Sequence, residues 1–136
     1  MIKWGMVVKN MPFEVGQKMT AVGVPNHNAE QFSVNIGLSE QEIALHINPR
    51  FNANGDEKTV VCSSHLEGSW GEEMRIKNFP FQQGEEFKII VEFSESGFMV
   101  ILPDGFKFTF LNRPGAKKYS CFSFGGEVSM KRLEVD

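Results

Sequence analysis

Short segments in which apolar and polar side chains alternate recur along the chain, separated by Gly, Pro, Asn, Asp or Ser. The clearest is 31–37, where Phe32, Val34 and Ile36 alternate with polar residues. Further segments of this kind are 19–24, 43–50, 59–64, 73–77, 87–93, 98–102, 106–110, 119–124 and 128–135. Since successive strand side chains point to opposite faces, each segment buries one face and exposes the other. The pattern lacks a helical repeat and predicts an antiparallel β-sandwich or barrel.

The connections between these segments carry recognisable turn signals. Asp104-Gly105 predicts a two-residue hairpin turn in which both residues accept positive φ, and 94–97 predicts a second hairpin. Asn54-Gly55 is expected to turn the chain so that Asp56 lies near a polar sheet face. The segment 39–42 resembles a helix capping box, but no apolar helical face follows it, so we interpret it as a turn.

Composition is consistent with one domain, residues 1–136, with a core that buries about two-thirds of the unfolded surface. Thirteen Phe against one Tyr and two Trp indicate that most aromatic residues are structural, because Phe has no polar group to place. Trp70 is therefore a candidate for work at the surface. Trp4 is expected to pack or to form an interface.

The net charge of −3, with acidic and basic residues mixed, argues against nucleic acid as a partner. No run approaches the ~18 apolar residues of a membrane span, so membrane insertion is not expected. The N-terminus lacks the features of a signal peptide, which predicts cytoplasmic synthesis. Alternation places Cys62 toward the core and Cys121 away from it, so no disulfide between them is expected.

A stripe of hydrogen-bonding side chains is predicted on the segment 43–50. His46, Asn48 and Arg50 alternate there with aliphatic residues, so they line one face of a strand. A histidine alone is more often structural, and such a stripe also occurs on solvated outer faces. Arg and Asn have poor β propensity at such positions, however, which favours a binding role.

A second group follows about twenty residues later, where Glu73 and Arg75 share one face of the predicted strand 73–77 and Trp70 precedes them. A flat aromatic ring beside His, Asn, Arg and Glu suits a ligand with a polar ring and one apolar face. We expect Glu73 and Asp56 to form ion pairs that keep Arg50 and Arg75 ordered for that ligand.

Metal chemistry is a poor alternative, and no cofactor is expected. His27, His46, His65 and Cys62 are the zinc-type ligands, but Cys62 and His65 are three apart, which places them on opposite strand faces. Calcium sites use several oxygen ligands, whereas Asp56-Glu57 is a single acidic pair.

Enzymatic chemistry is not expected either. Sugar hydrolysis needs two carboxyl groups that flank the scissile bond, and Glu72 and Glu73 are adjacent, so only one can face a ligand. Cys62 is predicted to be buried and inert, and no Ser-His-Asp or Cys-His arrangement is suggested.

At these residues the chain resembles the galectins, whose pattern is His-x-Asn-x-Arg followed by Trp-Gly-x-Glu-x-Arg. The matching residues are His46, Asn48, Arg50, Trp70, Glu73 and Arg75. Flanking stretches such as 51–53, 79–81 and 102–105 are also similar to the family. The resemblance implies an all-β jelly-roll β-sandwich of two antiparallel sheets that binds β-galactoside glycans of glycoproteins or glycolipids, without metal and without chemistry.

The resemblance also implies a role for each site residue. The ring face of galactose that carries C–H bonds would lie against Trp70. The stripe on 43–50 would bind the axial O4, and Asn48 and Glu73 would reach O6. Arg50, Glu73 and Arg75 would hold a hydroxyl of the next sugar.

Two positions depart from the family pattern. Asn54 stands where members often have His, and Ser63 stands where they usually have Asn. Ser63 supports an alternative, a protein-interaction or structural domain with this fold and weakened sugar binding. Another rival, an intracellular lipid carrier, would need a helical lid that the sequence does not predict.

The resemblance further implies that the terminal strands, around 6–8 and 130–135, lie at a sheet edge, where one-domain galectins commonly dimerise. A homodimer with two outward-facing sites would cross-link glycans. Such a role requires the protein to reach the extracellular space as well as the cytoplasm, by a non-classical export route.

Overall fold

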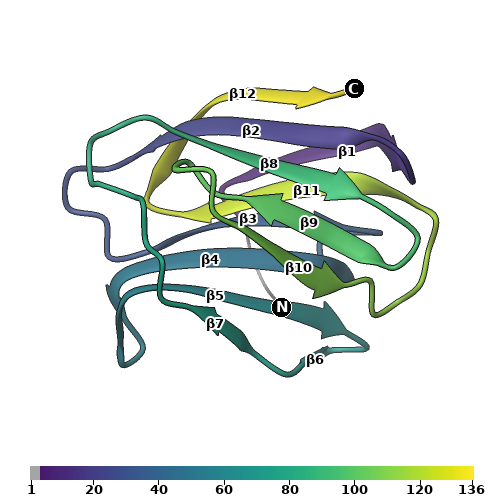
Figure 1. Ribbon diagram of the computed structural model, residues 1–136, viewed down its shortest axis with the longest axis horizontal. Coiled ribbons are helices and arrows are strands. Elements are labelled where there is room, and N and C mark those ends of the chain that lie inside the picture. Colours follow the sequence, from purple (N-terminus) through teal and green to yellow (C-terminus); the bar gives the residue numbers. More distant parts are fainter. Residues whose placement is uncertain (1–3) are drawn as a thin grey trace.

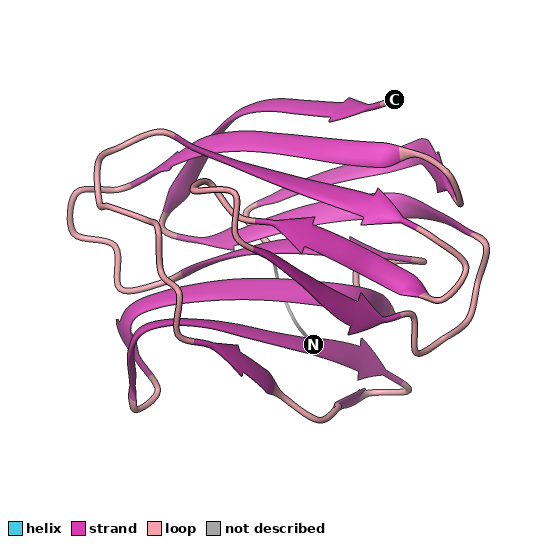
Figure 2. Ribbon diagram, in the orientation of Figure 1, coloured by secondary structure: helices cyan, strands magenta, loops and turns pink. Residues whose placement is uncertain are grey.

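The computed structural model describes residues 4–136, and these fold into two stacked antiparallel sheets without a helix (Figures 1 and 2). The larger sheet has the strand order β1-β11-β3-β4-β5-β6, with β7 also paired to β5, and the smaller has the order β10-β9-β8-β2-β12. The strands are β1 (Met6–Glu14), β2 (Lys18–Pro25), β3 (Phe32–Gly37), β4 (Ile43–Ala53), β5 (Asp56–Leu66), β6 (Ser69–Trp70), β7 (Met74–Ile76), β8 (Phe87–Phe93), β9 (Gly97–Ile101), β10 (Lys107–Leu111), β11 (Lys118–Gly126) and β12 (Val128–Val135). The predicted all-β sandwich is confirmed.

The core lies between the sheets and is rich in phenylalanine. Phe32 of β3 stacks on Phe87 of β8 with ring centroids 4.8 Å apart, which joins the two sheets directly. Phe13, Phe98 and Phe122 are fully buried, as the excess of Phe over Tyr and Trp predicts. Because phenylalanine buries a large apolar area, this core holds the sheets rigidly enough to carry a site on an outer face.

Both cysteines are free and buried. Cys62 lies on the core side of β5, as predicted, and burial raises the pKa of its thiol to about 12. Cys121 lies on β11, and β3 and β4 separate that strand from β5. The spacing between neighbouring strands, about 4.8 Å, puts the two thiols too far apart for a disulfide.

Three predicted turns are confirmed. In the 39–42 turn, the Leu38 amide donates to the carbonyl of Glu42 at 2.9 Å. The 94–97 hairpin closes through the Ser94 amide and the Gly97 carbonyl at 2.9 Å. Asn54 and Gly55 have φ of 50° and 84°, so they form a two-residue turn that pairs β4 with β5 and brings Asp56 back beside the sheet face.

The predicted two-residue turn at Asp104-Gly105 is wrong. Leu102 donates to the carbonyl of Phe106 at 2.8 Å, so the connection between β9 and β10 spans residues 103–105. Of these residues only Gly105 has positive φ, at 89°. Asp104 instead accepts a hydrogen bond from the amide of Phe106 through its side chain. A proline at position 103 fixes φ in the negative range and favours this longer turn.

The sequence pattern also underestimated β1, which runs from Met6 to Glu14 rather than over 6–8 alone. The pairing of β1 with β11 shifts between Lys9 and Phe13, and Asn10 in that interval has φ of 61°. This irregularity interrupts the period-two alternation, so the pattern of apolar residues does not reveal the whole strand.

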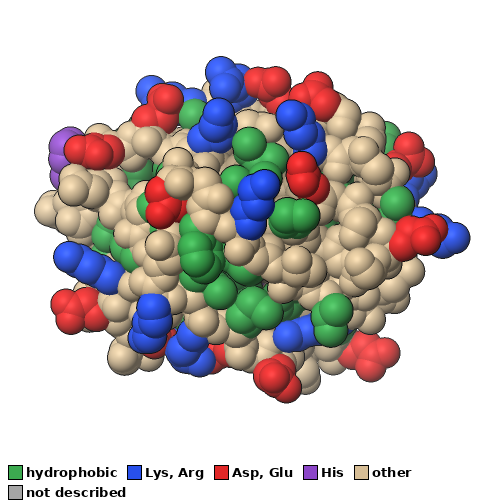
Figure 3. All heavy atoms as spheres, in the orientation of Figure 1, with side chains coloured by type: hydrophobic (Ala, Val, Ile, Leu, Met, Phe, Trp, Pro, Cys, Tyr) green, Lys and Arg blue, Asp and Glu red, His purple; other side chains and the backbone are tan. Residues whose placement is uncertain are grey.

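Lys and Arg side chains alternate with Asp and Glu over the visible face, without a large patch of one sign (Figure 3). None of the residues from 4 to 136 belongs to a helix that is long and apolar enough to cross a membrane.

Candidate binding site

The polar stripe predicted on 43–50 lies on the outer face of β4, between β3 and β5. Leu45 and Ile47, which alternate with the stripe, are fully buried in the core. His46 pairs with Asn35 of β3 and Ser63 of β5. The alternation therefore places the stripe correctly, and the strands on each side supply further polar groups.

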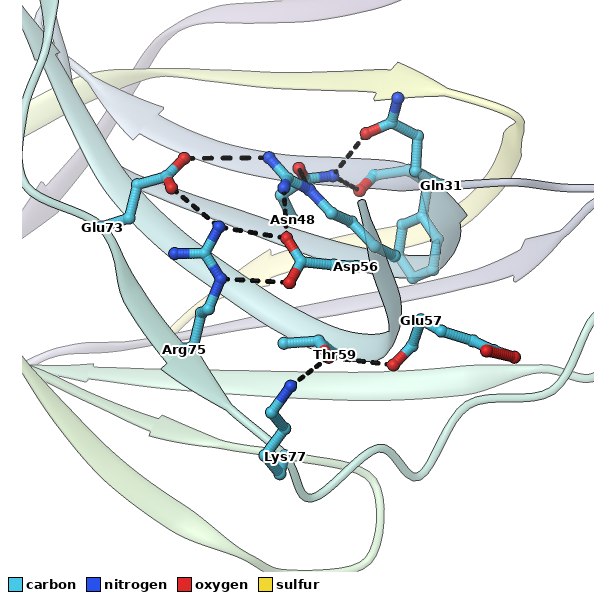
Figure 4. Close-up of polar contacts among 10 residues, drawn as sticks. Gln31, Asn48, Asp56, Glu57, Thr59, Glu73, Arg75 and Lys77 are labelled. Atoms are coloured by element: carbon cyan, nitrogen blue, oxygen red, sulfur yellow. Dashed lines mark hydrogen bonds and ion pairs between the residues drawn. The ribbon is translucent and has the colours of Figure 1, made fainter. Parts of the chain in front are cut away.

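The stripe joins an ion-pair network centred on Asp56 (Figure 4). Asp56 lies 2.7 Å from Arg50 and 3.1 Å from Arg75, while Glu73 lies 3.0 Å from Arg75 and 3.8 Å from Arg50. The hydrogen bond from Arg75, with that from Arg50, lowers the pKa of Asp56. The predicted network is confirmed, and it fixes both guanidinium groups before any ligand arrives.

The network has a buried end and an open end. The side chains of Arg50 and Asp56 are 10% and 11% exposed, whereas those of Glu73 and Arg75 are 41% and 42% exposed. Glu73 lies between β6 and β7 rather than in the strand 73–77 predicted for it, since β7 begins only at Met74. The ion pair to Arg75 nevertheless directs Glu73 toward the site.

Asn48 is held by hydrogen bonds on both sides of its amide. Its Nδ2 donates to the carbonyl of Phe32 at 2.8 Å and to Oε1 of Gln31 at 3.2 Å. Its Oδ1 accepts from Nε of Arg50 at 2.9 Å. Arg50 thus contacts Asn48, Asp56 and Glu73, and it keeps unused N–H groups because a guanidinium has five.

Asn35 determines the tautomer of His46, that is, which ring nitrogen carries the hydrogen. Asn35 was predicted to lie on the polar face of its strand, but no role was predicted for it. Nδ2 of Asn35 donates to the carbonyl of Ser123 at 3.2 Å, which turns its Oδ1 toward His46. Nδ1 of His46 lies 2.5 Å from that oxygen and must donate to it. Nε2 of His46 is therefore a hydrogen-bond acceptor.

Burial, and to a smaller extent the positive charge of Arg50, lowers the pKa of His46 to about 3. The imidazole is consequently neutral at physiological pH. An imidazole so placed accepts a hydrogen bond from a ligand hydroxyl and does not attract anions.

Trp70 forms an aromatic wall beside the stripe. It is 47% exposed, and its ring centroid lies 4.6 Å from that of His46 and 4.8 Å from that of His65. His65 is buried, and its Nδ1 donates to the carbonyl of Gln41 at 2.6 Å. The buried His65 ring therefore supports the indole of Trp70, and one face of the indole remains available to a ligand.

Ser63 lies beneath this wall. It is 2% exposed, and its hydroxyl donates to the carbonyl of Gly71 at 3.0 Å. Arg113, which was not predicted as a site residue, donates to the Ser64 hydroxyl at 2.9 Å and to the carbonyl of Glu72 at 2.8 Å. Both contacts hold the segment that carries Trp70 and Glu73 against the sheet.

These groups surround an open cavity of about 380 Å³. The predicted residues that line it are His46, Asn48, Arg50, Asn54, Ser63, Trp70 and Glu73. Arg75 and Asp56 do not line the cavity, but both are ion-paired with residues that do. The cavity also includes Trp4 and the pair Gln31 and Ser33, whose place at polar positions of the segment 31–37 was a usable signal. Trp4, expected to pack or to form an interface, is a wall of the cavity.

Within residues 4–136, no three His, Cys, Asp or Glu side chains are grouped so as to hold a metal ion. The two carboxylates at the site, Asp56 and Glu73, are both paired with arginine. The site thus offers an aromatic face, one neutral acceptor, and donors that ion pairs hold in position.

Comparison with known proteins places this arrangement in a family. A family model for galactoside-binding lectins matches residues 4–135. A β-galactoside-binding lectin of Electrophorus electricus is 43% identical over 131 residues, which cover 96% of this chain and 97% of that protein. Galectin-1 of Ovis aries is 37% identical over 127 residues, which cover 93% of this chain and 94% of that protein.

Solved structures agree with these matches. The crystal structure of Dario rerio galectin-1-L2 is similar with a TM-score of 0.94 and 48% identity, covering 96% of this chain and 98% of that one. Congerin II with lactose and MES bound is similar with a TM-score of 0.93 and 31% identity, covering 96% of this chain and 98% of that one.

Proposed function

Because the chain belongs to the galactoside-binding lectin family, we propose that it binds β-galactosides in the cavity on the outer face of β4. One observation carries this proposal: the exposed face of Trp70 stands beside a neutral His46 and an arginine that Asp56 holds in place. The proposal also has support from a relative, congerin II, whose structure contains lactose.

The geometry explains how galactose would be distinguished from glucose. The axial O4 of galactose leaves one ring face lined with weakly positive C–H bonds, and the negative π face of Trp70 suits that face. With the ring on Trp70, O4 points toward the stripe, where Nε2 of His46 accepts a hydrogen bond from the O4 hydroxyl and Arg50 donates one to the O4 oxygen. Glucose has an equatorial O4 and cannot make both contacts together.

The open end of the network would receive the next sugar. Glu73 and Arg75 are each about two-fifths exposed and lie beside Arg50, so their free donors and acceptors are available for hydroxyl groups. Asn48 and Glu73 would reach O6 of the galactose. Asn54 lines the cavity near the β4–β5 turn, and Asp56 supports the two arginines without touching sugar.

The proposed activity is binding without catalysis and without a metal cofactor. Hydrolysis would need a carboxylic acid that gives up a proton at neutral pH. Arg75 and Arg50 lower the pKa of Asp56, which keeps it ionised, and Glu73 is paired with the same arginines. The carboxylates at this site therefore organise cations rather than transfer protons.

Retention on lactose-agarose tests the proposal. We expect the protein to be retained, and to elute with lactose but not with sucrose or a chelator. Trp70→Ala should abolish retention with an unchanged circular dichroism spectrum, because Trp70 lies outside the core. A matched control is Leu111→Ala, which removes another exposed apolar side chain, 67% exposed, from a different strand. Retention of Trp70→Ala, or no retention of the wild type, would refute the assignment.

We further propose a twofold homodimer that cross-links glycans. The support is topological: β1 is an edge strand of the larger sheet and β12 an edge strand of the smaller one, and edge strands carry unpaired amides that invite a partner. The pairing of β12 with β2 shifts between Met130 and Arg132, and Arg132 is paired with Glu134 at 2.6 Å. These features interrupt the β12 edge, and the shift between Lys9 and Phe13 interrupts the β1 edge in the same way, so the structure does not favour one edge over the other.

A further inference from the structure

The indole of Trp70 is carried by a short strand whose backbone is held by β5. β6 has two residues and lies at the edge of the larger sheet, where Trp70 pairs with His65 (Figure 1). The amide of Gly71, the next residue, donates to the carbonyl of Ser64 at 2.8 Å. These contacts fix the main chain, but an exposed side chain on such a strand can still rotate between staggered orientations about its own bonds.

His65 is placed to restrict this rotation. Because His65 and Trp70 are a cross-strand pair, their side chains share the outer face of the larger sheet. Their ring centroids lie 4.8 Å apart with the planes at 63°, an edge-to-face arrangement. The other ring beside Trp70 is that of His46, which lines the cavity, whereas His65 does not. His65 can therefore set the orientation of the indole without contact with a ligand.

The 39–42 turn holds His65 in place. Nδ1 of His65 donates to the carbonyl of Gln41 at 2.6 Å, and the histidine is only 7% exposed. The next residue of the turn, Glu42, accepts a hydrogen bond through Oε1 from the amide of Glu67 at 2.8 Å. Glu67 belongs to the connection between β5 and β6. The turn, which does not line the cavity, thus holds both the histidine ring and the β5–β6 hairpin.

We propose that His65 is a positioning residue for sugar binding, whose ring, enclosed between the 39–42 turn and Trp70, holds the indole in the orientation that meets galactose. This inference rests on the proposed function. Ordering a side chain on binding costs affinity, and a protein that orders it in advance avoids that cost. His65 does this for Trp70, as Asp56 does for the two arginines. The affinity for β-galactosides therefore depends on a residue that does not touch the sugar.

Calorimetric titration of three His65 variants with lactose tests this inference. His65→Ala should bind lactose about two- to tenfold more weakly, the range that an edge-to-face aromatic contact supplies. His65→Phe keeps a ring against the indole and should stay within about twofold of the wild type. His65→Asn keeps an N–H donor for the carbonyl of Gln41 but lacks the ring, so it should lose as much affinity as His65→Ala.

A matched control is Ile89→Val, which removes a methyl group from the buried face of the other sheet. This variant should be less stable in urea and should keep the affinity for lactose, because its change lies in the core. It separates a general loss of stability from a change at Trp70.

The fluorine NMR signal of Trp70 in protein labelled with fluorotryptophan measures the orientation of the indole directly. Its absence in Trp70→Ala assigns the signal. It should be narrow in the wild type and in His65→Phe. In His65→Ala it should be broad, because the indole exchanges between orientations, and lactose should narrow it again. A residue that only stabilised the fold would leave this signal unchanged.

The possible results separate the explanations. Unchanged lactose affinity in His65→Ala would overturn the inference, and so would a loss of affinity with an unchanged Trp70 signal. Equal losses in His65→Phe and His65→Ala, or full affinity in His65→Asn, would also overturn it, because the hydrogen bond to Gln41 would then carry the effect. If His65→Ala does not fold, the difference between His65→Phe and His65→Asn decides. A wild type that does not bind lactose would reject the proposed function itself.

Discussion

The neutral state of His46 predicts an affinity for lactose that does not change between pH 7.5 and pH 5. An imidazole at the ordinary pKa of 6.5 would be protonated at pH 5 and would no longer accept the O4 hydroxyl. The affinity would then fall about 30-fold. With the pKa lowered to about 3, only about 1% of His46 is protonated at pH 5. The lowered pKa of Asp56 keeps the arginine network intact over the same range.

Calorimetric titration at half-unit steps of pH, with the nitrogen chemical shifts of His46 followed by NMR, measures both quantities. Flat affinity and an imidazole that titrates below pH 4.5 would agree with the structure. A loss of affinity centred near pH 6.5, together with titration of His46 at that pH, would refute the reasoning. His27→Gln, a change at an exposed histidine that does not line the cavity, serves as the control for nonspecific effects of pH.

The same lowered pKa makes stability depend on pH. The unfolded chain binds a proton at His46 near pH 6.5, whereas the folded chain binds it only near pH 3. The contribution of His46 is therefore complete above pH 6.5 and is lost as pH falls toward 3, by about 2 kcal/mol between neutral pH and pH 5. In urea unfolding, His46→Gln should reduce this slope, and His27→Gln should not.

Three further predictions concern Arg50, Ser63 and the assembly. Arg50→Lys should weaken lactose binding at least tenfold, because an ammonium cannot reach Asn48 and Asp56 together. The loss of one charge-assisted hydrogen bond costs about 1.5–3 kcal/mol, and a calorimetric loss of affinity below threefold would contradict this prediction. Ser63→Asn should bind lactose up to about tenfold more tightly, since its amide can donate to Gly71 and still reach O6; no gain would show that position 63 does not contact sugar. Sedimentation should show a dimer at tens of micromolar, and a monomer there would reject the proposed assembly.

The sequence predicted the features that depend on local periodicity. Alternation along β4 placed His46, Asn48 and Arg50 on one face, because the direction of a strand side chain is fixed within its own strand. The Asn54-Gly55 turn likewise determined that Asp56 returns beside this face, because its positive φ values depend on those two residues. The exposure of Trp70 was predicted from composition instead, because most aromatic residues of the chain are Phe.

Only the tertiary structure decided which groups meet across strands. The Asn35–His46 contact joins neighbouring strands, and the register between them determines it. Arg113 reaches the segment that carries Glu72 over 41 residues of sequence, and no local pattern indicates that contact. Trp4 became a wall of the cavity because β1 pairs with β11 and Gly125 leaves room for an indole. Periodicity determines the face of a strand on which a side chain lies, whereas strand order and packing determine its neighbours.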